Sequence, residues 1–123
     1  MTQVVKILEG FRHLYKGYRY FITGSIARNE SNPRDVDINI LPLSNNLSEW
    51  EELLKNFNDK KVDDLRIDAQ IIPNLNKVID GYKGEVDKYI YKDGKLSVKR
   101  AMVTNKKAYK KGIEQIPFAF MEI

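Results

Sequence analysis

Residues 21–40, FITGSIARNESNPRDVDINI, decide the fold. They begin inside an aromatic and β-branched run, residues 18–23, which is typical of a buried strand that ends in a tight turn at Gly24. The second half of the stretch alternates polar and apolar residues, the period of a strand with one polar face. Because Asp35 and Asp37 project from the same face, about 7 Å apart at the backbone, their carboxylates are expected to converge.

Periodicity predicts the remaining elements outward from this stretch. Expected helices cover residues 4–15, 47–57 and 105–112, and expected strands cover residues 65–71, 88–92, 95–99 and 117–123. A capping box starting at Ser48 is expected to begin the second helix, and Asp93-Gly94 supplies the positive φ angles of a two-residue hairpin turn. Residues 74–84 receive no assignment. The predicted fold class is α/β (α+β), a small mixed sheet with helices packed on one face and the carboxylates on the other.

Length and composition exclude several classes of protein. The chain has 123 residues, 42% of them hydrophobic, and shows no linker or repeat, so residues 1–123 are expected to form one domain. It has no cysteine, which excludes disulfides, thiolate zinc sites and cysteine nucleophiles. No apolar run approaches the roughly 20 residues of a membrane span. We therefore expect a soluble, cytoplasmic protein without a membrane partner, and its oligomeric state stays open.

The formal net charge of +4 is unevenly distributed along the chain. Residues 1–80 carry 11 basic and 12 acidic side chains, whereas residues 81–123 carry 10 basic and 5 acidic ones. Within the second part, residues 95–111 contain seven cations and no anion: Lys95, Lys99, Arg100, Lys106, Lys107, Lys110 and Lys111. Two interpretations remain open, a solvated face and a surface that binds a polyanion such as a nucleic acid.

A third carboxylate is expected beside Asp35 and Asp37. Asp68 shares the polar face of a later strand, whereas its rivals Asp63 and Asp64 precede that strand. Three clustered anions would repel one another unless cations lay between them, and all-oxygen ligands suit Mg²⁺ or Mn²⁺. Two such ions about 3.5 to 4 Å apart can stabilise the attacking and leaving oxygens of a phosphoryl displacement.

The quoted stretch, with LRIDAQII at residues 65–72, resembles the polymerase β-like nucleotidyltransferase superfamily. That family has a strand, Gly-Gly or Gly-Ser, about nine to thirteen residues, an Asp-hydrophobic-Asp motif, and a third carboxylate on a later strand. Here Gly24 and Ser25 match the turn, Asp35 and Asp37 match the metal pair, and Asp68 matches the third acid. The resemblance implies a minimal catalytic core and covers residues 20–72.

The resemblance also implies roles for these residues. An acceptor hydroxyl would attack the α-phosphate of a bound NTP, and pyrophosphate would leave. Asp35 and Asp37 would bind both metal ions, and Asp68 would bind the catalytic ion and help to deprotonate the acceptor. Ser25 would hold the β- or γ-phosphate, and Arg28 would neutralise charge on the leaving group or remain a solvated loop residue.

The acceptor is expected to be either a nucleic-acid end, such as that of a tRNA, or a hydroxyl of a partner protein, as in toxin–antitoxin modules. For the first, the contacts would come from Lys99, Arg100, Lys106, Lys107, Lys110 and Lys111. The alternative to an enzyme is a module of the same fold that binds nucleotides or nucleic acids without turnover. Asn29, where minimal members often have glycine, favours this alternative.

Overall fold

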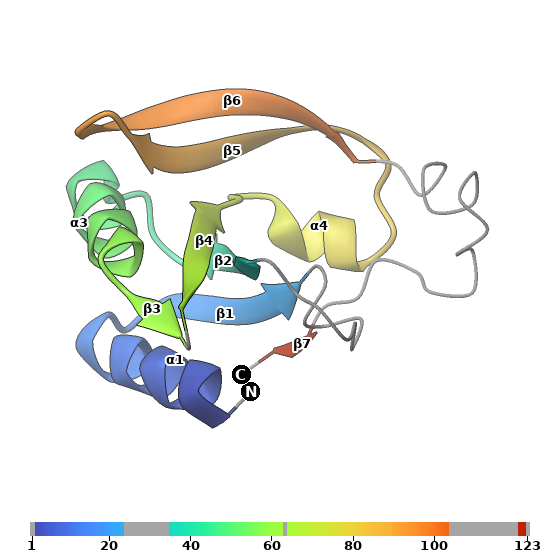
Figure 1. Ribbon diagram of the computed structural model, residues 1–123. Helices are drawn as coiled ribbons and strands as arrows, with labels where there is room; N and C mark the ends of the chain where they lie inside the picture. Colours follow the sequence, from blue (N-terminus) through green and yellow to red (C-terminus); the bar gives the residue numbers. More distant parts are fainter. Residues whose placement is uncertain (1, 24–34, 63, 104–120, 123) are drawn as a thin grey trace.

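The structure, a computed structural model, describes residues 2–23, 35–62, 64–103 and 121–122 (Figure 1). Its described helices are α1 (Thr2–Leu14), α3 (Leu47–Asn58) and α4 (Leu75–Ile79). Its described strands are β1 (Tyr18–Thr23), β2 (Asp35–Pro42), β3 (Lys61–Val62), β4 (Leu65–Ile71), β5 (Gly84–Lys92), β6 (Lys95–Val103) and β7 (Met121–Glu122). The helix and strand predicted for residues 105–112 and 117–123 lie outside the described residues, except for β7.

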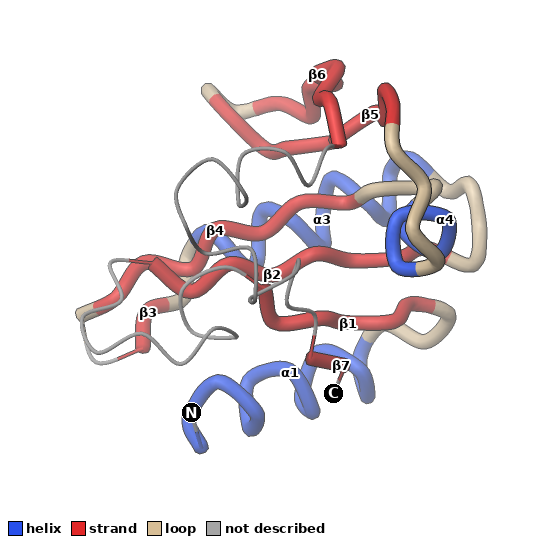
Figure 2. The backbone as a smooth tube through the Cα atoms, turned by 90° about the vertical axis from the view of Figure 1, so that its right-hand side faces the viewer, coloured by secondary structure: helices blue, strands red, loops and turns tan. Residues whose placement is uncertain are grey.

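One mixed sheet joins all the described strands, and Figure 2 shows its central members side by side. The strand order is β6-β5-β4-β2-β1-β7, and β3 adds to β4. β2 and β4 are parallel and are connected through α3, whereas β1 is antiparallel to β2. The predicted fold class, a small mixed α/β sheet, is confirmed, but the helices do not all pack on one face, because α4 packs on the other.

The two long helices bury one face of the sheet. Leu8 and Phe11 of α1 and Phe57 of α3 pack on alternating residues of the three central strands, such as Ile38. The rings of Phe11 and Phe57 stack with their centroids 3.7 Å apart, which joins the helices to each other. Trp50 is also buried in this cluster, as its place on the apolar stripe of α3 predicts. This layer holds the central strands in place.

The start of α3 corrects one expectation. The N-cap is Asn46, whose side chain accepts a hydrogen bond from the Glu49 backbone N–H, so the capping box expected at Ser48 is wrong. Both candidate caps are followed three residues later by a glutamate, and local sequence does not distinguish them. The Tyr18 hydroxyl donates to Glu49 Oε1 at 2.5 Å and ties β1 to the first turn of this helix.

The opposite face of the sheet is only partly covered. A second apolar cluster joins Phe21, Leu41 and Val86 to Leu75 and Val78, and the last two belong to α4. In Figure 1, α3 lies to the left of β4 and β2, and α4 lies to their right. Residues 74–84, which the sequence left unassigned, thus supply a short helix that covers the end of this face.

Strands β5 and β6 form the hairpin that Asp93-Gly94 predicts. They pair without interruption from Gly84 opposite Val103 to Lys92 opposite Lys95, and both strands are longer than expected. Asp93 and Gly94 have φ angles of 54° and 78°, the left-handed conformation that a tight two-residue turn requires.

The helices in the described part of the chain are all too short, or too polar, to span a membrane.

Candidate active site

Two of the three sequence motifs meet at one level of the sheet, and the strand that precedes the third motif ends there. Asp37 of β2 pairs with Asp68 of β4 on one side and with Thr23 of β1 on the other. Thr23 is the last described residue before the Gly24-Ser25 motif. Strands that are neighbours in a sheet lie about 5 Å apart, so the two aspartates start from adjacent backbone positions. The fold therefore brings together positions that are far apart in the sequence.

Three polar pairs lie directly opposite one another on β2 and β4. They are Asp35 with Arg66, Asp37 with Asp68, and Asn39 with Gln70, and we call these six residues the polar ladder. Because side chains alternate along a strand, all six project from the face opposite α1 and α3. The ladder thus places all three predicted carboxylates on the face that the long helices leave open.

Arg66 provides a positive charge at the outer end of the polar ladder. Its Nε lies 4.0 Å from Asp35 Oδ1, and both side chains are partly exposed. An ion pair of this length in contact with solvent is weak. Arg66 therefore neutralises Asp35 only in part.

The inner end of the ladder is an amide pair. Gln70 Nε2 donates to Asn39 Oδ1 at 2.5 Å, and Asn39 is only 4% exposed. Phe21, opposite Asn39 on β1, belongs to the second apolar cluster. The ladder therefore runs from a partly exposed end at Asp35 to a buried, hydrogen-bonded end at Asn39, which fixes the backbone beside the two aspartates.

The Asp37–Asp68 pair is the part of the ladder that needs an explanation. Like charges directly opposite on neighbouring strands destabilise a sheet, and two unit charges about 4 Å apart in water repel by about 1 kcal/mol. Asp68 is exposed and Asp37 half-buried, so solvent reaches the site. The donors are carboxylate oxygens, which fit Mg²⁺ or Mn²⁺. Within the described ranges, however, no three His, Cys, Asp or Glu side chains come close enough together to form a complete metal site.

The third carboxylate can be compared with its rivals. Asp64 is exposed in the turn between β3 and β4, with a φ angle of 67°, and Asp63 lies outside the described residues. Asp68 stands opposite Asp37. Of the two described candidates, only Asp68 shares the ladder with Asp35 and Asp37.

Several predicted site residues lie outside the described residues. They are the phosphate-binding candidates Gly24, Ser25 and Arg28, and the basic residues Lys106, Lys107, Lys110 and Lys111.

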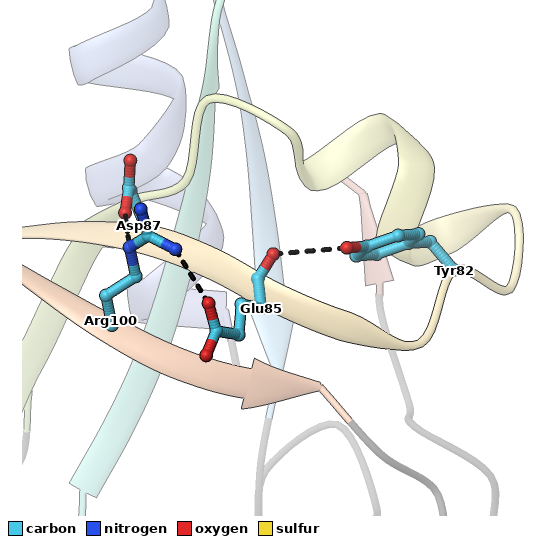
Figure 3. A network of polar contacts seen from close by, with 4 residues as sticks. All are labelled: Tyr82, Glu85, Asp87 and Arg100. Carbon is cyan, nitrogen blue, oxygen red and sulfur yellow. Dashed lines mark hydrogen bonds and ion pairs between the residues drawn. The ribbon is translucent and has the colours of Figure 1, made fainter.

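The structure separates two cations that the sequence grouped together, Lys99 and Arg100. Arg100 donates to Glu85 Oε2 at 2.7 Å and lies 3.1 Å from Asp87 Oδ1 (Figure 3). Lys99 is its neighbour in β6 and therefore projects from the other face of the hairpin. Arg100 is thus neutralised within the protein, whereas Lys99 is grouped with other lysines.

The aromatic side chains of the hairpin have a structural explanation. Tyr89 and Tyr91 are half-buried against the main apolar cluster, and the Tyr89 ring meets Trp50 edge to face with centroids 5.0 Å apart. They anchor the hairpin to the core instead of forming an open platform for bases.

A cleft of about 460 Å³ lies on the helical side of the molecule. Residues of α1 and of the end of α3 line it, among them Ile7, Leu14 and Asn56. The three aspartates are not part of its lining.

Comparisons with known proteins found no match. No family model matches the sequence, and no curated protein or solved structure matches the chain at a significant level. The case for a function therefore rests on the motifs and on the strand register described above.

Sequence reasoning did not predict that Arg66 pairs with Asp35 or that Gln70 pairs with Asn39, because the register between two parallel strands depends on the whole β2–α3–β4 unit. The grouping of Lys99 with Lys88 was also missed. The Asp-Gly turn carried that signal, since a two-residue loop determines every pair of the hairpin.

Proposed function

We propose that the chain is a metal-dependent nucleotidyltransferase of the polymerase β-like type. The single observation that carries this proposal is the register that sets Asp37 opposite Asp68, at the level where β1 ends before Gly24-Ser25. A Gly-Ser sequence directly after this strand, together with paired carboxylates, supports phosphoryl transfer with bound metal ions as the chemistry of the site.

The proposed reaction transfers a nucleoside monophosphate from an NTP to an acceptor hydroxyl. The hydroxyl oxygen forms a bond to the α-phosphorus, the bond from that phosphorus to the bridging oxygen breaks, and pyrophosphate leaves with the electron pair. Asp68 takes the hydroxyl proton and passes it to solvent. The acceptor is a nucleic-acid end or a hydroxyl of a partner protein, and the cytoplasm is the proposed location.

Asp35, Asp37 and Asp68 are the proposed ligands of Mg²⁺ or Mn²⁺. Bound there, two ions would supply positive charge to the phosphates and to the oxygens that attack and leave. A bound cation would also relieve the repulsion between Asp37 and Asp68, and Arg66 would then move from Asp35 toward solvent. Ser25 and Arg28 keep the phosphate-binding roles that the resemblance implies.

A second candidate function is binding without turnover. The 4.0 Å contact between Arg66 and Asp35 favours it, because a cation of the chain itself already lies next to one of the three carboxylates. In this case the protein would bind a nucleotide or nucleic acid and transfer nothing.

Label transfer distinguishes the two candidates. The protein is incubated with each α-³²P-labelled NTP, with Mg²⁺ or Mn²⁺, and with total RNA or cell lysate. We expect labelled acceptor from the wild type and none from Asp37→Asn or Asp68→Asn. Asp64→Asn is the matched control, because it removes the same charge from an exposed turn whose φ angle asparagine tolerates.

Each other outcome contradicts part of the proposal. Full transfer by Asp37→Asn would rule out metal-dependent transfer at this site. Transfer lost in Asp64→Asn but kept in Asp68→Asn would assign the third carboxylate to Asp64. The absence of transfer with any NTP in either metal would favour the binding module.

A further inference from the structure

Four lysines gather on one face of the β5–β6 hairpin. Lys88 pairs with Lys99 and Lys92 pairs with Lys95, and the register between these pairs is uninterrupted. Paired residues share a face, and so do residues four apart in a strand, so all four side chains project together. We call this surface the lysine face. Lys92, Lys95 and Lys99 are exposed, and Lys88 is half-buried.

The acidic residues of the hairpin strands lie on its other face. Glu85 and Asp87 both contact Arg100 there, as Figure 3 shows. Asp93, the remaining acid of the hairpin, is in the turn. Among the described residues, none of the four lysines forms an ion pair. The hairpin thus separates its charges, with a neutralised arginine on one side and uncompensated lysines on the other.

This arrangement is unfavourable for the hairpin alone. Each pair sets two ammonium groups directly opposite each other, where like charges weaken strand pairing. The pairs lie four residues apart, which is about 13 Å along the strands. In a duplex, each strand carries one charge about every 3.4 Å of helix axis, so about four phosphates of one strand span this length, and fewer do so in an extended single strand. The lysine face therefore matches a linear polyanion in both charge and length.

We infer that the lysine face binds the phosphodiester backbone of a nucleic acid. Lysine ammonium groups on flexible stems act as point charges for phosphate and do not require one orientation of the ligand. The inference deepens the proposed function, because it assigns the nucleic-acid contact to one surface, and binding measured without NTP can fail or succeed separately from label transfer.

A membrane surface fits the same charges less well. Ile90 and Ser97, which separate the two lysine pairs, are both half-buried. Val98, the most exposed apolar residue of the hairpin among the described ones, is a partner of Tyr89 and lies on the opposite face. Stable binding to a lipid surface needs apolar side chains that enter the bilayer beside the basic ones. Among the described residues, the lysine face has no exposed large apolar side chain, because Ile90 is half-buried.

The test is the salt dependence of binding to a fluorescein-labelled single-stranded RNA of 20 nucleotides, measured by anisotropy. Each phosphate contact contributes about −0.7 to the slope of log K against log salt, so four contacts contribute about −3. Between 50 and 200 mM NaCl these contacts alone would lower affinity by about 50-fold. We expect Lys88→Gln/Lys92→Gln/Lys95→Gln/Lys99→Gln to bind more weakly at 50 mM and to lose about three units of slope.

The matched control is a second fourfold Lys→Gln variant, which changes the net charge by the same amount but on the helical side of the molecule. Lys6, Lys16, Lys55 and Lys60 are all exposed, and their replacement by glutamine should leave the slope nearly unchanged. Lys92→Gln/Lys95→Gln is a milder variant near the turn, for which we expect a loss of about half the effect. It keeps the test valid if the fourfold variant does not fold, which circular dichroism would show.

Three results would overturn the inference. One is an unchanged slope in folded variants of the lysine face. Another is an equal loss of slope in the control variant, which would mean that the effect depends on net charge and not on the lysine face. The third is binding to phosphatidylserine vesicles, lost in the lysine-face variant, without binding to RNA, which would identify a membrane surface instead.

Discussion

Asp37 and Asp68 occupy directly opposed positions on the parallel strands β2 and β4. The register places two residues of like charge side by side, and a cation bound between them should lower the repulsion between them. The pair therefore gives a test of the site that needs no knowledge of substrate.

Asp68→Asn should stabilise the metal-free protein. Removal of one of two opposed charges is expected to raise the free energy of unfolding by up to about 1 kcal/mol in EDTA. With Mg²⁺ added, the wild type should gain stability and the variant should gain less. Urea unfolding followed by the fluorescence of Trp50, the single tryptophan, measures both effects. Asp64→Asn is the control, and a destabilised Asp68→Asn in EDTA would contradict the repulsion.

Tyr18→Phe should change the stability of the protein at alkaline pH. Burial raises the pKa of the Tyr18 hydroxyl well above its usual value near 10, and the hydrogen bond to Glu49 raises it further. A pKa that is higher in the folded state stabilises the fold below about pH 10, and this contribution falls as pH rises above it. Because the variant lacks this hydrogen bond, its free energy of unfolding at pH 7 should be lower by about 1 to 2 kcal/mol. Its melting temperature should then fall less steeply above pH 10. Parallel pH profiles for the two proteins would contradict this assignment.

Phe57→Ala should be among the most destabilising single substitutions. The ring is fully buried, stacks on Phe11 and lies against Tyr20 with centroids 6.1 Å apart, so its removal leaves a cavity between both long helices and the sheet. The expected loss is about 3 to 5 kcal/mol in the free energy of unfolding. Phe57→Leu, which fills most of the space, should cost less than half as much. A loss below about 2 kcal/mol for alanine would mean that the helices close the gap.

Gly94→Ala should weaken the hairpin through its backbone. Nothing lies within 4 Å of a Cβ placed on Gly94, but its φ angle of 78° is one that alanine rarely adopts. The expected cost is about 1 to 2 kcal/mol, and Gly94→Asn should cost less because asparagine tolerates this conformation. Thermal unfolding compares the two variants. Equal losses of stability in the two variants would mean that the cost comes from contacts around the turn and not from the φ angle of residue 94.

The strands of the candidate site could be predicted because their pattern is local. Alternation along residues 35–40 and 65–71 predicts which side chains share a face, and Asp93-Gly94 predicts the hairpin. The register between β2 and β4 could not be predicted in the same way. A shift of two residues would keep every side chain on its face and yet set Asp35, not Asp37, opposite Asp68. The register depends on how α3, which connects the two strands, packs on the sheet beside α1.

The helix boundaries show the same limit on a smaller scale. Asn46 and Ser48 are both good caps, and each has a glutamate three residues later. The choice of Asn46 extends α3 so that Glu49 reaches the Tyr18 hydroxyl, a contact between residues 31 positions apart. Local sequence preference does not decide between the two N-caps, and the N-cap that is used comes with a tertiary hydrogen bond.

The attachment of the β5–β6 hairpin has a consequence for how the protein opens. Among the described residues of β4 and β5, the register shows the single pair Ile71–Tyr89, whereas β2 and β4 pair at six positions. The hairpin is otherwise joined to the body by side chains, such as Tyr89 against Trp50. In amide hydrogen exchange we therefore expect β5 and β6 to exchange as a cooperative unit at lower free energy than β2. The β5–β6 hairpin, which carries the lysine face, would then open while Asp37 and Asp68 stay paired on β2 and β4.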